Sequence, residues 1–162
     1  MHDNNHQLTK VTGPTGIATD YTYDLLGRVT AEISPDRGTI SYEYDQADNL
    51  IKRTEGRGVV TLYTYDTLER LIDVTYPASA QENITYTYDT CLNGIGRLCQ
   101  IIDQSGTTDY TYDHWGNVIT QTRTVASGQT FTTTYQYDAG NQLISQTLPT
   151  NRQVDLTRDT LR

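Results

Sequence analysis

The sequence predicts an all-β chain of repeated antiparallel hairpins, joined into one meandering sheet. Three observations support this prediction: a recurring Tyr-x-Tyr-Asp motif, an aliphatic residue five positions after most of its aspartates, and clusters of turn-forming residues between the motifs. Such an internal period identifies a repeat architecture before any single residue is interpreted. Because one hairpin alone is marginal in water, each copy is expected to pair with its neighbours.

The motif occurs six times and contains twelve of the thirteen tyrosines. Its residues are Tyr21, Tyr23 and Asp24; Tyr42, Tyr44 and Asp45; Tyr63, Tyr65 and Asp66; Tyr86, Tyr88 and Asp89; Tyr110, Tyr112 and Asp113; and Tyr135, Tyr137 and Asp138. Residues two apart in a strand point to one face, so the two tyrosines of each copy should share a face. We expect their rings to stack from repeat to repeat in a wide, thin sheet without a thick aliphatic core.

Each aspartate is expected to end its strand and begin a tight turn. An Asp side chain accepts a hydrogen bond from the backbone N–H two residues on. A residue that tolerates the left-handed region three positions later suits a type I turn with a G1 bulge. Gly27 and Gly116 occupy that position in the first and fifth copies, whereas Glu69 occupies it in the third, which predicts a different third turn. The aliphatic residue that follows, such as Val29, should open the returning strand.

The fourth copy has an enlarged turn. Leu98 stands nine residues after Asp89 instead of five, and Cys91 and Cys99 bracket the insertion. The two cysteines should face each other across the mouth of the hairpin, which favours a disulfide that staples the turn. Two free thiols and a metal site remain alternatives, although no other His or Cys lies near; the spacing excludes a redox Cys-x-x-Cys motif. A disulfide would imply an oxidising compartment.

The period continues toward both ends of the chain. Leu8 precedes Asp24 by 16 residues, the step that also separates Val29 from Asp45 and Leu50 from Asp66. Leu8 should therefore open the returning strand of a hairpin whose Tyr-x-Tyr-Asp half is missing. Asp159 lies 16 residues after Leu143, in a degenerate copy that has lost both tyrosines. The sequence therefore predicts a single array over residues 1–162 that is a piece of a longer protein.

Charge and composition argue against several classes of partner. The chain has 12 Lys plus Arg against 20 Asp plus Glu, and its net charge of −8 disfavours a surface for nucleic acid or an anionic membrane. No apolar run approaches the roughly 18 residues that span a bilayer. The first residues lack the basic and apolar parts of a signal peptide.

Motifs that carry catalysis are missing from the sequence. It contains no Gly-Lys-Ser/Thr phosphate loop, no Gly-x-Ser-x-Gly elbow and no His-Glu-x-x-His pair. Six aspartates at equivalent positions are explained by turn geometry, whereas catalysis needs groups made different by their surroundings. His2 and His6 are four apart, but we prefer a frayed terminus to a metal site there. We therefore expect no enzyme activity, no cofactor, and no catalytic or metal-binding residue.

His114 and Trp115 lie in the turn of the fifth hairpin. A His beside a Trp suits stacking on a sugar, whereas a Trp that folds over the sheet edge at a turn tip needs no ligand. We prefer the turn-tip interpretation. The alternative hypothesis is a cell-surface carbohydrate-binding or adhesion module, in which Trp115 would contact the carbohydrate.

The stretch Tyr21 to Thr30, Tyr-Thr-Tyr-Asp-Leu-Leu-Gly-Arg-Val-Thr, resembles the YD repeat of Rhs proteins. That repeat is shared with teneurins and with the BC component of insecticidal Tc toxin complexes. The turn from Cys91 to Cys99 also resembles a variant turn seen within Rhs arrays. The resemblance covers roughly residues 5–162, and six ordered copies make it specific.

This resemblance implies a spiralling β-sheet, in which strips of hairpins form a shell around a C-terminal toxin domain or a barrel in a cell-surface protein. The implied partners are other YD repeats of the same protein, an enclosed toxin domain and a secretion-system spike, and the implied location is secreted or at the bacterial cell surface. The sequence holds no toxin domain and no Asp-Pro self-cleavage motif, since Pro149 follows Leu148. No catalytic residue is therefore carried over from the family.

Overall fold

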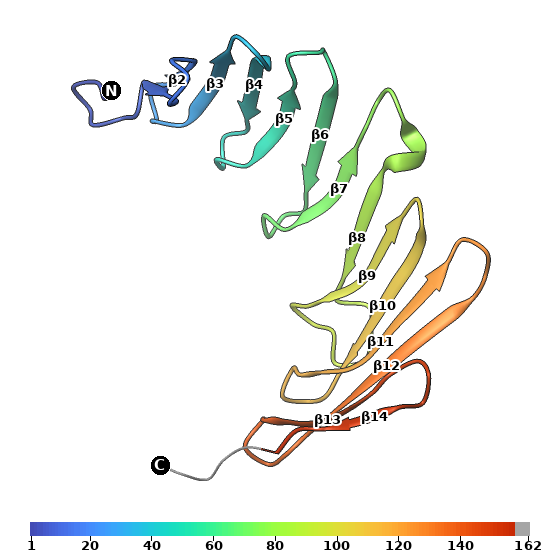
Figure 1. Cartoon of the computed structure of the whole chain (residues 1–162). Helices are drawn as coiled ribbons and strands as arrows, with labels where there is room; N and C mark the ends of the chain where they lie inside the picture. The colour runs from blue at the N-terminus through green and yellow to red at the C-terminus, as the bar shows by residue number, and fades with distance from the viewer. Residues whose placement is uncertain (158–162) are drawn as a thin grey trace. The chain divides into compact units, whose positions relative to one another are not determined.

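The computed structural model describes residues 1–157, and within them the chain is all-β apart from one short 3-10 helix, η1 (Ala80–Glu82) (Figure 1). The chain divides into two compact units, Met1–Ala80 and Gln81–Arg162. In both units the strands follow one another in sequence order, and each pairs antiparallel with the next. This confirms the predicted all-β meander of hairpins.

The first unit contains seven strands. They are β1 (Lys10–Thr12), β2 (Ala18–Tyr23), β3 (Val29–Ser34), β4 (Gly38–Tyr44), β5 (Leu50–Thr54), β6 (Val60–Tyr65) and β7 (Leu71–Thr75). The described residues of the second unit contain seven more: β8 (Ile84–Tyr88), β9 (Leu98–Asp103), β10 (Gly106–Tyr112), β11 (Val118–Val125), β12 (Thr130–Tyr137), β13 (Leu143–Thr147) and β14 (Gln153–Asp155).

The strands begin and end where the repeat predicts. Every even-numbered strand from β2 to β12 ends at the second tyrosine of a motif, and the strand after it begins at the aliphatic residue. Tyr and Thr suit a pleated, half-buried surface, and the Asp after them favours a turn over a longer strand. Local residue choice therefore accounts for both ends of each hairpin.

Each of these hairpins also contains a β-bulge that the sequence analysis did not anticipate. In the first hairpin Tyr23 pairs with Val29 and Thr22 pairs with Ala31, so one residue of the returning strand has no partner. The unpaired residues of the six hairpins are Thr30, Ile51, Ile72, Cys99, Ile119 and Ile144. A bulge bends its strand and increases the local twist, so the twist is built in once per repeat.

The core of the described sheet is thin, as expected. The buried apolar residues among residues 1–157 are Ile40, Val74, Cys99 and Tyr112, and no large side chain there is fully buried. Val74 pairs directly with Tyr63, which places it on the tyrosine face of the sheet. The tyrosine side chains therefore provide the buried surface on this face, a role that a second layer of helices or strands has in thicker folds.

The structure corrects our interpretation of the N-terminus. Asp3 stands five residues before Leu8 and already forms the repeat's turn: its Oδ1 accepts hydrogen bonds from the N–H groups of Asn5 and Gln7, at 2.8 and 2.9 Å. His6 takes the left-handed position, with φ of 63°. The turn is present, and His2 bridges to Leu8 where a second tyrosine would pair. The expectation was therefore wrong for the aspartate and for a frayed terminus, whereas both tyrosines of this copy are absent, as expected.

Two further points concern the limits of the chain. The degenerate copy predicted at Asp159 lies outside the described residues, so the single array over residues 1–162 stays a prediction. Within residues 1–157, no helix has the length and apolar character needed to cross a membrane.

Candidate functional site

The repeated aspartate organises its turn through its carboxylate, and in four copies, at Asp24, Asp45, Asp66 and Asp113, both carboxylate oxygens accept hydrogen bonds. In the first copy, Asp24 Oδ1 accepts from the N–H groups of Leu26 and Arg28, both at 2.9 Å. Asp24 Oδ2 accepts from Arg28 Nε at 2.7 Å. The Gly27 N–H donates to the Asp24 carbonyl at 3.1 Å, and the Asp24 N–H donates to the Arg28 carbonyl at 3.0 Å. One side chain thus ties down five consecutive residues.

The same turn recurs at Asp45, Asp66, Asp113 and Asp138, whose Oδ1 atoms accept from the N–H groups two and four residues on. The residue three positions after each of these aspartates, and after Asp24, has a positive φ: Gly27, Asp48, Glu69, Gly116 and Asn141. Glu69 has φ of 61° and its N–H donates to the Asp66 carbonyl, so the third turn has the common geometry. The expectation of a different third turn was wrong, because the Asp66 bonds hold the backbone in the left-handed region despite the Cβ.

These hydrogen bonds lower the pKa values of four turn aspartates. The backbone N–H of Arg28 and its guanidinium outweigh burial and lower the pKa of Asp24. The side-chain amide of Asn49 does the same for the pKa of Asp45. The pKa values of Asp66 and Asp113 are also lowered. Each of these turns is therefore built around an ionised carboxylate.

A side chain four residues after the aspartate connects one turn to the next. Arg28 Nη1 donates to Asp48 Oδ1 at 2.6 Å and to the Asp45 carbonyl at 3.1 Å, and its guanidinium lies 4.8 Å from the centre of the Tyr44 ring. In the second unit Asn117 Nδ2 donates to Asn141 Oδ1 at 3.1 Å. The sequence signal was the Arg, Asn or Gln at this position in every copy, which the sequence analysis overlooked.

The second tyrosine of a motif reaches back to the preceding hairpin. Its hydroxyl donates to the carbonyl of the aliphatic residue that opens the preceding returning strand. The pairs are Tyr23 to Leu8 at 2.8 Å, Tyr44 to Val29 at 2.9 Å, Tyr65 to Leu50 at 2.9 Å, Tyr112 to Leu98 at 2.5 Å and Tyr137 to Val118 at 3.1 Å. We expected stacked rings; the contact that the second tyrosine makes with the preceding repeat is this hydrogen bond.

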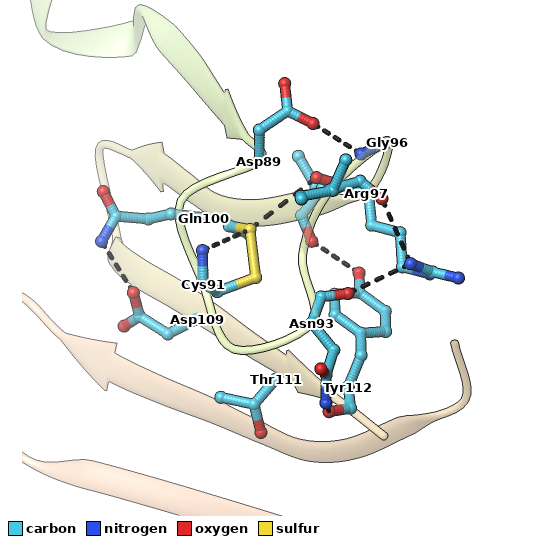
Figure 2. The surroundings of a disulfide bond; sticks show 12 residues. Asp89, Cys91, Asn93, Gly96, Arg97, Gln100, Asp109, Thr111 and Tyr112 are labelled. Atoms are coloured by element: carbon cyan, nitrogen blue, oxygen red, sulfur yellow. Dashed lines mark hydrogen bonds between the residues drawn. A yellow bond between two sulfur atoms is a disulfide. The ribbon is translucent and has the colours of Figure 1, made fainter. Parts of the chain in front are cut away.

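The enlarged fourth turn is closed by a disulfide between Cys91 and Cys99, whose Cα atoms are 5.4 Å apart (Figure 2). Cys99 is the bulge residue of its hairpin and is only 3% exposed. Gly94 lies directly against the bridge, since a Cβ there would be 2.4 Å from Cys91 Sγ and 2.5 Å from Cys99 Sγ. The loop is therefore wrapped closely around the two sulfur atoms.

The same loop, residues 91–99, packs on the next hairpin at Tyr112. The Tyr112 N–H donates to the Leu92 carbonyl at 3.2 Å, and Asn93 Nδ2 donates to the Tyr112 carbonyl at 2.8 Å. The Arg97 guanidinium lies 5.6 Å from the centre of the Tyr112 ring. Figure 2 shows Asn93 and Arg97 approaching Tyr112 from the loop. The insertion thus fastens two hairpins together.

A second polar cluster lies at the opposite end of the hairpins. Arg123 donates to both carboxylate oxygens of Asp103, from Nη2 at 2.7 Å and from Nη1 at 3.1 Å. Arg123 Nη1 also donates to Thr108 Oγ1 at 2.9 Å, and Nη2 donates to Ser105 Oγ. These bonds hold the pKa of Asp103 well below its usual range. Sequence reasoning missed the cluster because its members share no motif.

Trp115 lies at the tip of the fifth turn, where its side chain is 65% exposed and its ring is 4.6 Å from that of His114. Beside it is an open hollow of about 480 Å³, bordered also by Ile119, Tyr135 and Ile144. Polar side chains, among them Asp113, Gln136 and Asp138, line the hollow together with the aromatic and aliphatic ones, so it offers both stacking surfaces and hydrogen-bond partners.

The polar side chains of the described sheet are engaged with one another. Among residues 1–157 every buried side-chain nitrogen or oxygen has a hydrogen-bond partner. Within the same residues no group of three or more His, Cys, Asp and Glu side chains is arranged to hold a metal ion. The site of this chain is therefore its own repeat junction: the Asp turn, the tyrosine hydroxyl and, once, the disulfide.

Sequence comparison finds a repeat family over part of the chain. The family model described as RHS Repeat matches residues 2–39 and 44–81. No curated protein matches the sequence.

Structural comparison finds the same fold in toxin complexes. A Photorhabdus luminescens Tc holotoxin pore matches with a TM-score of 0.74 and 20% identity, over 96% of this chain and 9% of that chain. Crystal structures of TcdB2-TccC3-Cdc42 and TcdB2-TccC3-TEV match with TM-scores of 0.78 and 0.76, each at 20% identity, over 99% and 97% of this chain and 10% and 9% of those chains. This chain thus spans about a tenth of the length of the chains it matches, and the likeness is one of fold.

Proposed function

We propose that this chain, which carries Rhs repeats over residues 2–39 and 44–81, is a section of a β-sheet wall in a longer protein that encloses or displays a C-terminal effector domain. The observation that carries the proposal is the hydrogen bond from the second tyrosine of a motif to the preceding hairpin, seen at Tyr23, Tyr44, Tyr65, Tyr112 and Tyr137. It recurs at equivalent positions and is satisfied within the sheet. Such a contact serves to extend a sheet, and it singles out no residue for chemistry.

The remaining features of the chain support a passive wall. Every buried side-chain nitrogen or oxygen among residues 1–157 has a hydrogen-bond partner within the chain, and the recurring aspartates and tyrosines bond to backbone groups that shape the sheet. The tyrosine face is covered by its own side chains, and the sheet grows by adding one more hairpin at an edge. We therefore infer a non-catalytic role.

The partners and location follow from the same proposal. The immediate partners are other repeats of the same protein, and the enclosed partner is a toxin or effector domain delivered with a secretion-system spike. The Cys91–Cys99 disulfide suits a protein that spends time in an oxidising compartment, in keeping with secretion or the bacterial cell surface.

The test uses the complete protein in which this chain occurs. Limited trypsin digestion is followed on the domain after the repeats, in the complete protein and with that domain expressed alone. We expect the domain to survive in the complete protein under conditions that digest it alone, because a closed wall excludes the protease. Equal digestion rates contradict enclosure, and hydrolysis of a glycoside, ester or peptide panel by this chain contradicts a passive role.

A carbohydrate-binding module is the second candidate, favoured by the hollow beside the exposed Trp115. A glycan array followed by calorimetry tests it. The matched control is Leu26→Ala, since Leu26 occupies the same turn position in the first copy and is 72% exposed. Micromolar binding that is lost in Trp115→Ala and kept in Leu26→Ala establishes this function, and the absence of saturable binding removes it.

A further inference from the structure

We propose that the Cys91–Cys99 disulfide is a thiol-exchange site, and that its reduction by a small thiol such as glutathione unlocks the fourth hairpin from the fifth. This inference concerns the junction between two repeats and does not depend on what the wall encloses. It rests on three features: access to the bridge, the surroundings of its two sulfur atoms, and what the loop between them holds.

A small thiol has a route to the bridge. A hollow of about 310 Å³ lies against the disulfide, with both cysteines, Leu92 and Gln100 among its lining residues. Cys91 is half-buried, whereas Cys99 is 3% exposed. An incoming thiolate therefore meets Cys91 Sγ first, because attack on a disulfide requires direct approach to one sulfur.

The surroundings of the bridge favour departure of the other sulfur. The Cys91 N–H donates to Cys99 Sγ at 3.0 Å (Figure 2). Such a donor stabilises a thiolate more than a neutral sulfur, because hydrogen bonds to charged acceptors are stronger. Cys99 is thus the better leaving group, since the thiolate that forms on it has a partner in place.

The exchange is balanced as two thiol steps. In the first, the glutathione thiolate forms a bond to Cys91 Sγ, the bond between the two cysteines breaks, and its electron pair stays on Cys99. In the second, another glutathione thiolate attacks the glutathione sulfur of the mixed disulfide and releases the Cys91 thiolate. Oxidised glutathione leaves, and the two protons lost by the two glutathione thiols neutralise the two cysteines.

The released loop is the one that holds Tyr112. Leu92 and Asn93, which lie between the two cysteines, supply the partners of the Tyr112 N–H and carbonyl. Gly94 packs on the bridge itself, so opening the bridge removes the surface around which the loop is wrapped. Without the cross-link the loop regains conformational freedom, and holding it on Tyr112 then costs entropy.

The change should remain local. Pairing between β9 and β10 runs from Gln100 and Asp109 to Asp103 and Gly106 and does not involve the loop. The hydroxyl of Tyr112 still donates to the Leu98 carbonyl. Reduction therefore opens the turn end of the junction and leaves its other end paired.

The experiment treats the oxidised chain with reduced glutathione and follows two readouts. Alkylation and peptide mass mapping report which cysteine carries glutathione in the mixed disulfide, and we expect Cys91. Hydrogen exchange reports the Tyr112 amide, and we expect its rate to rise about tenfold or more when the loop is released. The control is the Asp138 amide, which donates to the Gln142 carbonyl in another turn and should not change.

A double variant, Cys91→Ser with Cys99→Ser, keeps the proposal testable without reductant. Its Tyr112 amide should exchange at the fast rate with or without glutathione. Unchanged exchange at Tyr112 after full reduction overturns the proposal, as does a mixed disulfide found on Cys99. Equal loss of protection at Asp138 overturns it too, because the bridge would then stabilise the whole unit and not one junction.

Discussion

The hydroxyl of Tyr65 donates to the carbonyl of Leu50 across 2.9 Å, and this bond adds a side-chain contact to the β5–β6 pairing that joins the third hairpin to the second. Burial raises the pKa of Tyr65, so the hydroxyl stays protonated and keeps its role as donor at neutral pH. A buried hydroxyl without a partner costs free energy, which makes the tyrosine specific for a neighbour that presents a carbonyl at this place.

Tyr65→Phe should lower the free energy of unfolding by about 1 kcal/mol, because it leaves the Leu50 carbonyl without its donor. Urea denaturation measures the change. The matched control is Tyr63→Phe, which removes a hydroxyl two residues away for which the described part of the chain shows no hydrogen bond. Equal effects of the two substitutions contradict the role assigned to the Tyr65 hydroxyl.

Acid should weaken the fold through the turn aspartates. The pKa values of four of them, Asp24, Asp45, Asp66 and Asp113, are lowered in the folded chain. The stability that these four contribute is therefore present above the unfolded pKa and is lost as pH falls through the folded pKa. We expect the melting temperature to be level above about pH 5 and to fall below it. Asp66→Asn should reduce the slope of that fall, because the ionised acceptor is gone.

The control for the acid prediction is Asp20→Asn, which removes a carboxylate that pairs with Lys10 outside the turns. It should leave the slope of the acid limb close to that of the unmodified chain. A slope that changes as much in the control as in Asp66→Asn shows that general charge, and not the turn, causes the acid sensitivity.

Gly116→Ala should cost about 1 kcal/mol, because φ of 93° strains any residue with a Cβ. The new methyl group would also displace Arg97, whose Nη2 lies 2.1 Å from its position. Gly140→Ala is the matched control, since Gly140 lies in the next turn and is not among the glycines with positive φ. Thermal denaturation of both variants decides whether the left-handed requirement belongs to the third position after Asp.

The parts of the fold that were predictable are those encoded within a few residues. Tyr-x-Tyr sets a strand, Asp sets the turn, and the five-residue step from Asp24 to Val29 sets the start of the return. The same step from Asp3 to Leu8 was present in the sequence, and applying it strictly would have revealed the first turn. The repeat period was enough to predict these features, because each one reflects a local conformational preference that recurs in every copy.

The features that were missed depend on the alignment of neighbouring hairpins. The bond from Tyr44 to Val29 spans 15 residues and is set by register, which residue preferences do not specify. The bulge at Ile51 or Ile119 has no marker beyond a frequent isoleucine. The contacts of Arg28 with the next turn were signalled by a recurring Arg, Asn or Gln, but their partners are visible only once two turns lie side by side.

Arg123 binds at the end of its hairpins opposite the Asp turns, through a planar guanidinium that donates to two oxygens at once, which lysine cannot do. Its two terminal nitrogens engage both oxygens of Asp103, and Nη1 also binds the buried Thr108. A lysine carries one point of charge, so Arg123→Lys should leave at least one of these acceptors without a donor and cost about 1 to 2 kcal/mol. The pKa of Asp103 should rise toward its ordinary value, so the stability that its ionised form contributes is reduced at neutral pH, and the variant should lose less stability than the unmodified chain as pH falls. The control is Arg57→Lys at an exposed arginine for which the described chain shows no ion pair, and urea denaturation at neutral and acidic pH compares the two. If Arg123→Lys is as stable as Arg57→Lys at both pH values, the cluster contributes no more than an ordinary surface pair.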